Sequence, residues 1–236
     1  MPAASGHQPI DLTRSQETIA LQNAHLLLSY HYQDDVSKVL ASNGMIQDRI
    51  EKLAMDIRNQ YNPDEELHLM CVLKGSRGFF TTLLKYLTRM ACYSSSSQAP
   101  FLEHYARILQ PGAEGSKSES EVIARLGDNH SHEITIVSEN LACVRDKHVL
   151  VCEDLINTGK TLALFCAKLR EYGPKSLRIA TLLEKRQSSD VPLKADFCGF
   201  TLPSTEFVVG YSLDHQEKYR DLTHLCALKP QVVLKT

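Results

Sequence analysis

The sequence has 236 residues, of which 43% are apolar, so one α/β domain with extra segments can bury a sizeable core. A formal charge of -2, from 26 basic and 28 acidic residues, excludes the strong basic field typical of proteins that bind nucleic acid or anionic membranes. The seven scattered cysteines include no C-x-x-C pair, and no run reaches the roughly 18 apolar residues that span a bilayer. We therefore expect a cytoplasmic protein without disulfides that binds neither nucleic acid nor a membrane.

The first half of the chain predicts a helix followed by a strand, a turn and a second helix. Residues 1–40 lack a clear period, and we interpret them as an N-terminal extension. Apolar residues recur at spacings of three and four from Met45 to Tyr61, which predicts an amphipathic helix. The apolar run His68–Leu73 predicts a buried strand, and a mixed apolar stripe predicts a helix at Phe79–Met90.

The middle of the chain predicts two strands separated by a long loop. Residues alternate between apolar and polar from Phe101 to Leu109, as in a strand. Residues 110–132 are rich in Gly, Ser and acidic residues, and we interpret them as a mobile loop, because long loops inside compact domains are usually functional or disordered. A short strand is predicted at Glu133–Val137.

Alternating strands and helices then predict the fold class. Val149–Cys152 is a buried strand, Gly159–Tyr172 is a helix and Leu177–Leu183 is another buried strand. Such alternation requires crossover connections, and therefore an α/β fold with a central parallel twisted sheet flanked by helices. Ligands of such sheets bind at the carboxyl ends of the strands.

The end of the chain contains short β-rich pieces, at Phe197–Leu202, Phe207–Tyr211 and Leu225–Leu228. We interpret them as a small flap over the ligand edge of the sheet. The expected organisation is an N-terminal extension (1–40) that contributes to this flap, a core (41–190) with the mobile loop, and a C-terminal flap segment (191–236).

The segment VLVCEDLINTGKT, residues 149–161, carries the clearest chemical signal. Unpaired backbone N–H groups at the start of a helix attract an anion, Gly159 allows close approach, and the hydroxyls of Thr158 and Thr161 suit a phosphate. Two alternatives are a Thr-capped helix preceded by exposed acids and a Walker nucleotide loop. The Walker pattern needs Gly where this chain has Asp154.

The adjacent acids Glu153 and Asp154 add a second element to this cradle. Carboxylate oxygens accept hydrogen bonds from the vicinal hydroxyls of a sugar. An acid pair beside a phosphate cradle therefore indicates a site for a phosphorylated ribose, and the segment resembles the motif with which phosphoribosyltransferases bind phosphoribosyl pyrophosphate (PRPP).

The resemblance extends beyond this segment. Four further strings are similar, in order, to the site elements of the hypoxanthine-guanine phosphoribosyltransferase family: LKG (73–75), LEKR (183–186), FVVGYSLD (207–214) and YRD (219–221). The similarity covers roughly residues 40–228. It implies a type I phosphoribosyltransferase fold, with a small hood built from the N- and C-terminal segments.

The resemblance also implies roles for individual residues. Lys74 and Gly75 match a pyrophosphate-binding turn in which the peptide is often cis, and Arg220 matches a residue that meets the pyrophosphate. Glu153 and Asp154 match acids that bind the ribose hydroxyls. The cradle for the 5-phosphate matches Thr158, Gly159, Lys160 and Thr161.

Further matches concern the purine and the metal. Lys185 matches a catalytic lysine that donates to the 6-oxo group of the base, which favours oxopurines because an ammonium offers only donors. Phe207 matches a residue that stacks on the base, and Val208 one whose carbonyl reads the amino group of guanine. The implied cofactor is Mg²⁺, a hard cation held by oxygen ligands. Its implied protein ligands are Glu153, Asp154 and Asp214.

The implied reaction transfers the phosphoribosyl group of PRPP to hypoxanthine or guanine, giving IMP or GMP and pyrophosphate in purine salvage. The implied ligands are therefore PRPP, the purine base and IMP or GMP, and a homodimer or homotetramer is expected. Two positions depart from the family. Asn157 stands where the family has an aspartate that acts as general base, and Gln110 and Pro111 stand where its mobile loop has a Ser-Tyr pair.

Asparagine lacks the basicity of aspartate, and loss of a positioned base typically costs ~100- to 10,000-fold in rate. Two hypotheses follow: an active transferase with reduced or altered activity, or a catalytically weak paralogue that binds a nucleotide or PRPP in a sensing role. A third reading of Asn157 is that of an ordinary turn residue in an enzyme whose base lies elsewhere.

Overall fold

The computed structural model describes residues 9–12, 26–62, 64–92, 101–109, 121–126, 132–138, 140–186 and 193–234. The helices are η1 (Tyr30–Tyr32), α2 (Asn43–Arg58), α3 (Arg77–Cys92), η2 (Leu141–Val144), α4 (Lys160–Glu171) and α5 (Pro230–Val233). The strands are β1 (Ile10–Asp11), β2 (Val36–Ala41), β3 (Leu67–Leu73), β4 (Phe101–Leu109), β5 (Glu121–Leu126), β6 (His132–Ser138), β7 (His148–Ile156), β8 (Ser176–Arg186), β9 (Phe197–Pro203), β10 (Val208–Val209) and β11 (Leu225–Leu228).

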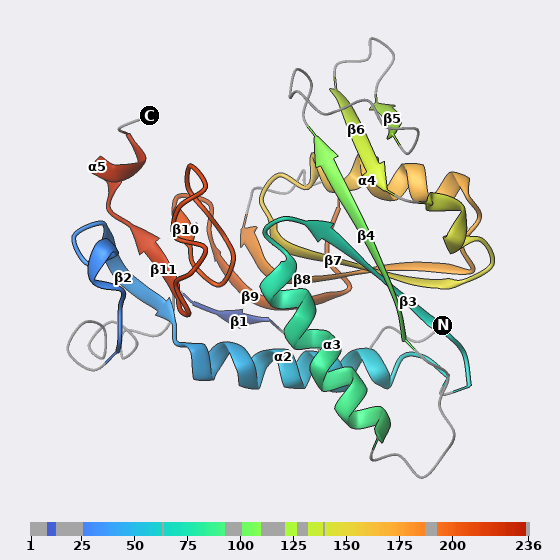
Figure 1. Ribbon diagram of the computed structural model, residues 1–236, viewed down its shortest axis with the longest axis horizontal. Helices are drawn as coiled ribbons and strands as arrows, with labels where there is room; N and C mark the ends of the chain where they lie inside the picture. Colours follow the sequence, from blue (N-terminus) through green and yellow to red (C-terminus); the bar gives the residue numbers. More distant parts are fainter. Residues whose placement is uncertain are drawn as a thin grey trace.

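The main sheet has eight strands in the order β1-β9-β8-β7-β3-β4-β6-β5 (Figure 1). Pairing is parallel from β1 to β4 and antiparallel for β4 with β6 and for β6 with β5. The sheet is therefore mixed, with a parallel centre as predicted. The prediction of an unbroken loop at 110–132 is wrong at residues 121–126, which form β5 at the edge of the sheet.

Helices cover both faces of the sheet. Helices α2 and α3 pack on one face in the largest apolar cluster, and α4 packs on the other face in a second cluster. Figure 1 shows α4 on the opposite side of the sheet from α2 and α3. Strand β3 is buried along nearly its whole length, which explains its continuous apolar run.

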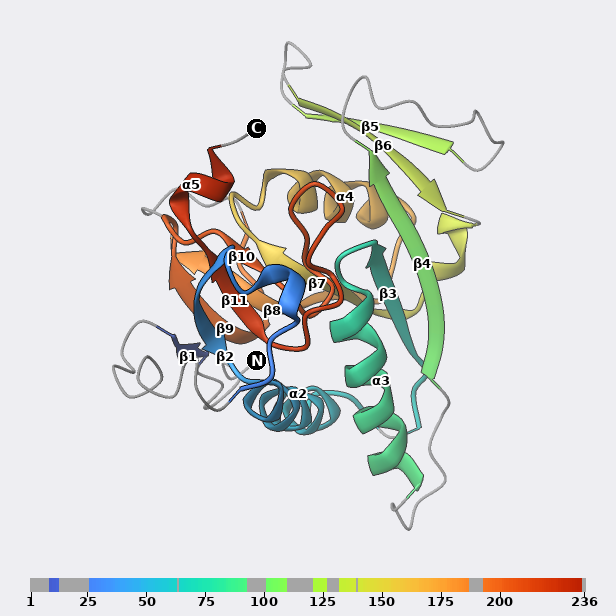
Figure 2. The same ribbon diagram turned by 60° about the vertical axis from the view of Figure 1, so that its left-hand side comes forward.

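A separate three-stranded antiparallel sheet, β10-β11-β2, forms the predicted hood. It joins residues 36–41 to residues 208–209 and 225–228, so both ends of the chain contribute to it. The prediction that Phe197–Leu202 belongs to the flap is wrong, because β9 pairs with β8 in the main sheet. Figure 2 shows the connection between β10 and β11 beside the start of α3.

All seven cysteines are free, and five of them are buried. No helix in the described part of the chain combines the length and apolar character needed to cross a membrane.

Candidate functional site

A cavity of about 250 Å³ lies at the carboxyl ends of the central strands. It is lined by residues from the ends of three neighbouring strands and from the start of a helix: Val72, Leu73, Ile108, Glu153, Leu155, Ile156, Asn157, Thr158, Gly159, Thr161 and Leu162. The segment that carries the chemical signal in the sequence therefore faces a hollow at the edge where α/β sheets bind ligands.

The floor of this cavity is the junction between β7 and α4. Strand β7 continues to Ile156, beyond the predicted end at Cys152, so Glu153 and Asp154 lie within the strand. Gly159 adopts a left-handed conformation (φ 70°) immediately before α4 and is buried, whereas the side chains of Asn157 and Thr158 are exposed. A residue with a Cβ would be strained at this φ.

Helices α2 and α4 begin differently. The hydroxyl of Ser42 accepts a hydrogen bond from Met45 N at 3.3 Å and caps α2. Helix α4 begins at Lys160, and its N-cap residue is Gly159, which has no side chain with which to cap the helix. The start of α4 borders the cavity, and the N-terminus of a helix is an arrangement that attracts a phosphate.

The acid pair lies beside this cradle. The backbone N–H of Asp154 donates to Ser76 Oγ at 3.0 Å, and Leu155 N–H donates to Asp154 Oδ1 at 2.8 Å. Burial raises the pKa of Glu153 well above its ordinary value, and the neighbouring charge of Asp154 raises it further. Burial also raises the pKa of Asp154. Two crowded carboxylates with raised pKa values favour a cation or hydrogen-bond donors as their ligand.

The turn after β3 packs directly against these acids. The Leu73–Lys74 peptide is cis, as the resemblance implies. A Cβ on Gly75 would lie 1.7 Å from Asp154 Oδ2, so only glycine fits between the turn and the carboxylate. The next residue, Ser76, is fully buried and holds the backbone of Asp154. The turn and the acid pair are therefore one packed unit.

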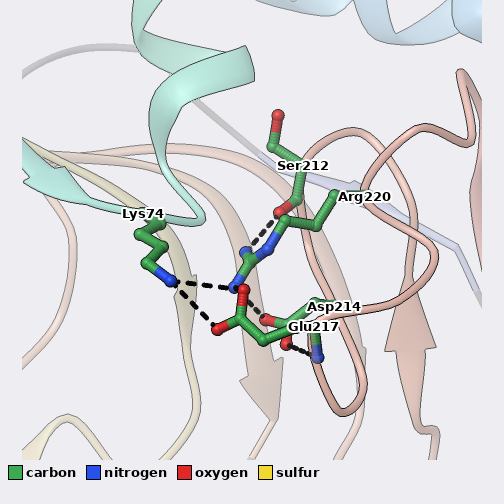
Figure 3. Close-up of polar contacts among 5 residues, drawn as sticks. All are labelled: Lys74, Ser212, Asp214, Glu217 and Arg220. Atoms are coloured by element: carbon green, nitrogen blue, oxygen red, sulfur yellow. Dashed lines mark hydrogen bonds and ion pairs between the residues drawn. The ribbon is translucent and has the colours of Figure 1, made fainter.

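A cluster of charged side chains lies next to this turn (Figure 3). Arg220 Nη2 is 2.8 Å from Asp214 Oδ1, and Arg220 Nη1 donates to the carbonyl oxygen of Ser212 at 2.8 Å. Glu217 lies between Lys74 and Arg220, with carboxylate oxygens 3.2 and 3.3 Å from them. Four charged residues from two distant segments therefore meet beside the acid pair.

Lys185 and Phe207 line a second cavity, of about 520 Å³. Burial lowers the pKa of Lys185, an effect that the charge of Glu206 opposes. The ring of Phe207 contacts His215 edge to face, with centroids 4.9 Å apart. Val208 is buried and pairs with Ala227 in the hood. The residues matched to the purine thus lie together, where the main sheet meets the hood.

The predicted metal ligands do not form a protein-only cage. In the described residues, no group of three or more His, Cys, Asp or Glu side chains is placed to hold a metal ion. Asp214 is paired with Arg220, whereas Glu153 and Asp154 are adjacent. Gln110 and Pro111, the departures in the family's mobile loop, lie outside the described residues.

Two residues of the site were missed by sequence reasoning. Ser76 follows the Lys74–Gly75 turn directly, and a small hydroxyl residue after a tight turn was an available signal. Glu217 lies three residues before Arg220, a spacing at which the two side chains can pair, but the sequence does not reveal the contact with Lys74.

Comparisons with known proteins agree with this geometry. The family model described as "Phosphoribosyl transferase domain" matches residues 38–216. The chain is 45% identical over 207 residues to the hypoxanthine-guanine-xanthine phosphoribosyltransferase of Plasmodium falciparum, covering 87% of this chain and 83% of the relative. It is 35% identical over 198 residues to the hypoxanthine-guanine phosphoribosyltransferase of Homo sapiens, covering 84% of each.

The structure of hypoxanthine-guanine phosphoribosyltransferase from Schistosoma mansoni in complex with IMP superposes with a TM-score of 0.68 at 29% identity, covering 98% of this chain and 95% of that one. The fold, the cavity at the start of α4 and the match to the family model together define a phosphoribosyltransferase. Within that class, the chain belongs to the hypoxanthine-guanine phosphoribosyltransferase family.

Proposed function

We propose that this protein transfers the 5-phosphoribosyl group of PRPP to a 6-oxopurine, hypoxanthine or guanine, and releases IMP or GMP and pyrophosphate in purine salvage. The observation that carries the proposal is the cavity at the start of α4, lined by Glu153, Thr158, Gly159 and Thr161. Relatives named for this activity support it, and none of those described above is named as a sensor.

The phosphoribosyl group has two sets of partners in this proposal. Backbone N–H groups of residues 158–161 and the hydroxyls of Thr158 and Thr161 bind the 5-phosphate, helped by the positive end of the α4 dipole. Lys160 contributes to this cradle through its backbone, since it is the first residue of α4. Glu153 and Asp154 accept hydrogen bonds from the ribose hydroxyls.

Lys74, Gly75 and Arg220 bind the pyrophosphate of PRPP in this proposal. The donor set fits Mg²⁺: Glu153 and Asp154 are crowded acids with raised pKa values, and Asp214 lies in the cluster of charged side chains beside them. These three carboxylates would hold the ion together with phosphate and water oxygens, because Mg²⁺ needs few protein ligands. Bound Mg²⁺ supplies neutralisation of the charge that develops on the leaving pyrophosphate.

The purine lies against Phe207, with its 6-oxo group facing Lys185 and its 2-position read by the carbonyl of Val208. Lys185 can satisfy an oxo group but not the amino group of adenine, because its ammonium offers only donors. Burial shifts the pKa of Lys185 downward, so the lysine is partly desolvated where it meets the base. Its hydrogen bond is therefore expected to be stronger than one made in water.

Bond formation joins a purine nitrogen to the anomeric carbon while the bond from that carbon to pyrophosphate breaks, and the purine loses a proton to water. The anomeric carbon gains oxocarbenium character, as in glycoside cleavage. Asn157 lies in the cavity at this point, and its amide can donate to the unprotonated nitrogen 7 of the product, but it cannot accept the proton as a carboxylate would. The expected consequence is good nucleotide binding with slowed turnover.

The test is a turnover assay with PRPP, Mg²⁺ and each of hypoxanthine, guanine, xanthine and adenine, with detection of both the nucleotide and pyrophosphate. Hypoxanthine or guanine should give stoichiometric nucleotide and pyrophosphate, and adenine should give none. Absence of product from every base, together with absence of GMP binding by calorimetry, would refute the proposal. The cytoplasmic location and the homodimeric or homotetrameric state stay predictions, and light scattering on the purified protein tests the second.

A further inference from the structure

An exposed carboxylate of the protein bridges the two cations that the proposed function assigns to pyrophosphate. Glu217 Oε1 and Oε2 lie 3.2 and 3.3 Å from Lys74 Nζ, and Oε2 lies 3.3 Å from Arg220 Nη2. Lys74 and Glu217 are 143 residues apart in the sequence, so the fold creates this contact. In Figure 3 the Glu217 carboxylate points between the two cations. Carboxylate and phosphate oxygens compete for such donors.

A tight turn holds Glu217 in this position. His215 and Lys218 pair as an isolated antiparallel bridge, with N–H to O distances of 3.2 and 3.1 Å. The two residues between them, Gln216 and Glu217, have φ angles of 54° and 61°, as in a two-residue type I′ hairpin turn. Glu217 N–H also donates to Asp214 Oδ2 at 2.9 Å. The backbone therefore presents the carboxylate to the cations.

Of the two acids that contact Arg220, Glu217 is the one whose side chain can move away from it. Asp214 contacts Arg220 at 2.8 Å, and 29% of its side chain is exposed, whereas Glu217 contacts Arg220 at 3.3 Å and 66% of its side chain is exposed.

We propose that Glu217 is an internal competitor of pyrophosphate. Its carboxylate holds Lys74 and Arg220 before PRPP binds, yields them to the pyrophosphate group, and takes them back as pyrophosphate leaves. The inference rests on the proposed function and adds to it a residue that sets the affinity for PRPP and the rate of pyrophosphate release. Exposed ion pairs are weak, so the expected effect on affinity is about two- to tenfold.

The test compares pyrophosphate binding, in the presence of Mg²⁺, to the wild type and to the variants Glu217→Gln and Glu217→Asp by calorimetry. Gln removes the charge, whereas Asp keeps it on a side chain one methylene shorter, which cannot reach both cations. Glu171→Gln is the matched control, because Glu171 is an exposed glutamate that forms a local ion pair with Lys168 on α4. GMP binding is measured in each protein, since a monophosphate does not need the two cations.

Both Glu217 variants should bind pyrophosphate about two- to tenfold more tightly than the wild type, with unchanged GMP affinity, and Glu171→Gln should match the wild type. The steady-state signature is a lower KM for PRPP and a lower inhibition constant for pyrophosphate. Unchanged or weaker pyrophosphate binding in Glu217→Gln overturns the inference. Wild-type behaviour of Glu217→Asp also overturns it, because net charge and not contact would then be responsible. A wild type that binds neither pyrophosphate nor GMP contradicts the proposed function instead.

Discussion

The phosphate cradle and the charged cluster beside the Lys74 turn differ in the physical means by which we propose that they bind anions. The cradle consists of contiguous residues, 157–161, and relies on backbone N–H groups at the start of α4. The cluster consists of Lys74, Asp214, Glu217 and Arg220, and relies on side-chain charges. The cradle offers the partial positive charge of a helix start. The cluster, in contrast, already contains an anion, Glu217, that contacts both of its cations.

The largest expected effect comes from disrupting the close contact between Gly75, in the Lys74 turn, and Asp154, beside the cradle. Gly75→Ala places a Cβ where Asp154 Oδ2 now lies, 1.7 Å away, so the turn or the acid pair must move. We expect kcat/KM to fall by about 100-fold, as for a misplacement of about 1 Å in an active site. Gly44→Ala is the control, because its Cβ would meet only Ser42 Oγ at 4.0 Å. Steady-state kinetics with equal values for Gly75→Ala and the wild type would contradict the packed unit described for the turn.

A substitution with a smaller expected effect tests whether the cradle and the cluster bind their ligands independently. Thr161→Val keeps the shape of the side chain at the first turn of α4 but removes its hydroxyl. Hydrogen bonds to charged groups contribute about 1.5–3 kcal/mol, so GMP affinity should fall by about tenfold or more. Pyrophosphate affinity should be unchanged, which is the mirror image of the result expected for Glu217→Gln. Calorimetry that finds the same loss for both ligands would show that the two regions act as one.

Sequence reasoning succeeded for the fold where the determinants are local, because the helices and buried strands follow from apolar periodicity. The β7–α4 segment is contiguous and lines a cavity, and its role as a phosphate cradle stays a prediction. Strand β5 was missed because residues 110–132 have the composition of a loop. Strand β9 was assigned to the wrong sheet because short β-rich pieces near the end of the chain look alike. The contact between Lys74 and Glu217 depends on tertiary proximity, which no local pattern encodes.

The smallest expected effect lies away from the ligand edge, in a pair of histidines on β3 and β4. His68 is buried, and its Nδ1 is 2.8 Å from Nε2 of His104, with the rings stacked 5.0 Å apart. Burial lowers the pKa of His68 below its ordinary value of 6.5, and the charge of His104 lowers it further, while Glu66 opposes the shift. Below about pH 6.5 the unfolded chain therefore binds more protons than the folded protein, so the free energy of unfolding falls with falling pH.

His104→Gln removes the charge of His104, which is the second cause of the lowered pKa of His68. Urea unfolding between pH 7 and pH 5 should show a shallower loss of stability in His104→Gln, by about 1 kcal/mol or less, since one pKa unit corresponds to about 1.4 kcal/mol. His31→Gln, at an exposed position, is the control. Activity at pH 7 should stay at the wild-type level. An equally steep pH dependence in His104→Gln and the wild type would show that the pair does not act through the pKa of His68.

The most direct test concerns position 157, where the cradle meets the reacting atoms. The rate of IMP formation from hypoxanthine, PRPP and Mg²⁺ is compared between the wild type and Asn157→Asp. If this edge of the sheet carries out the transfer and the missing carboxylate limits it, Asn157→Asp should raise kcat/KM by at least about 100-fold, the usual size of general-base effects. Equal rates in the two proteins would contradict the account, because the base would then lie elsewhere.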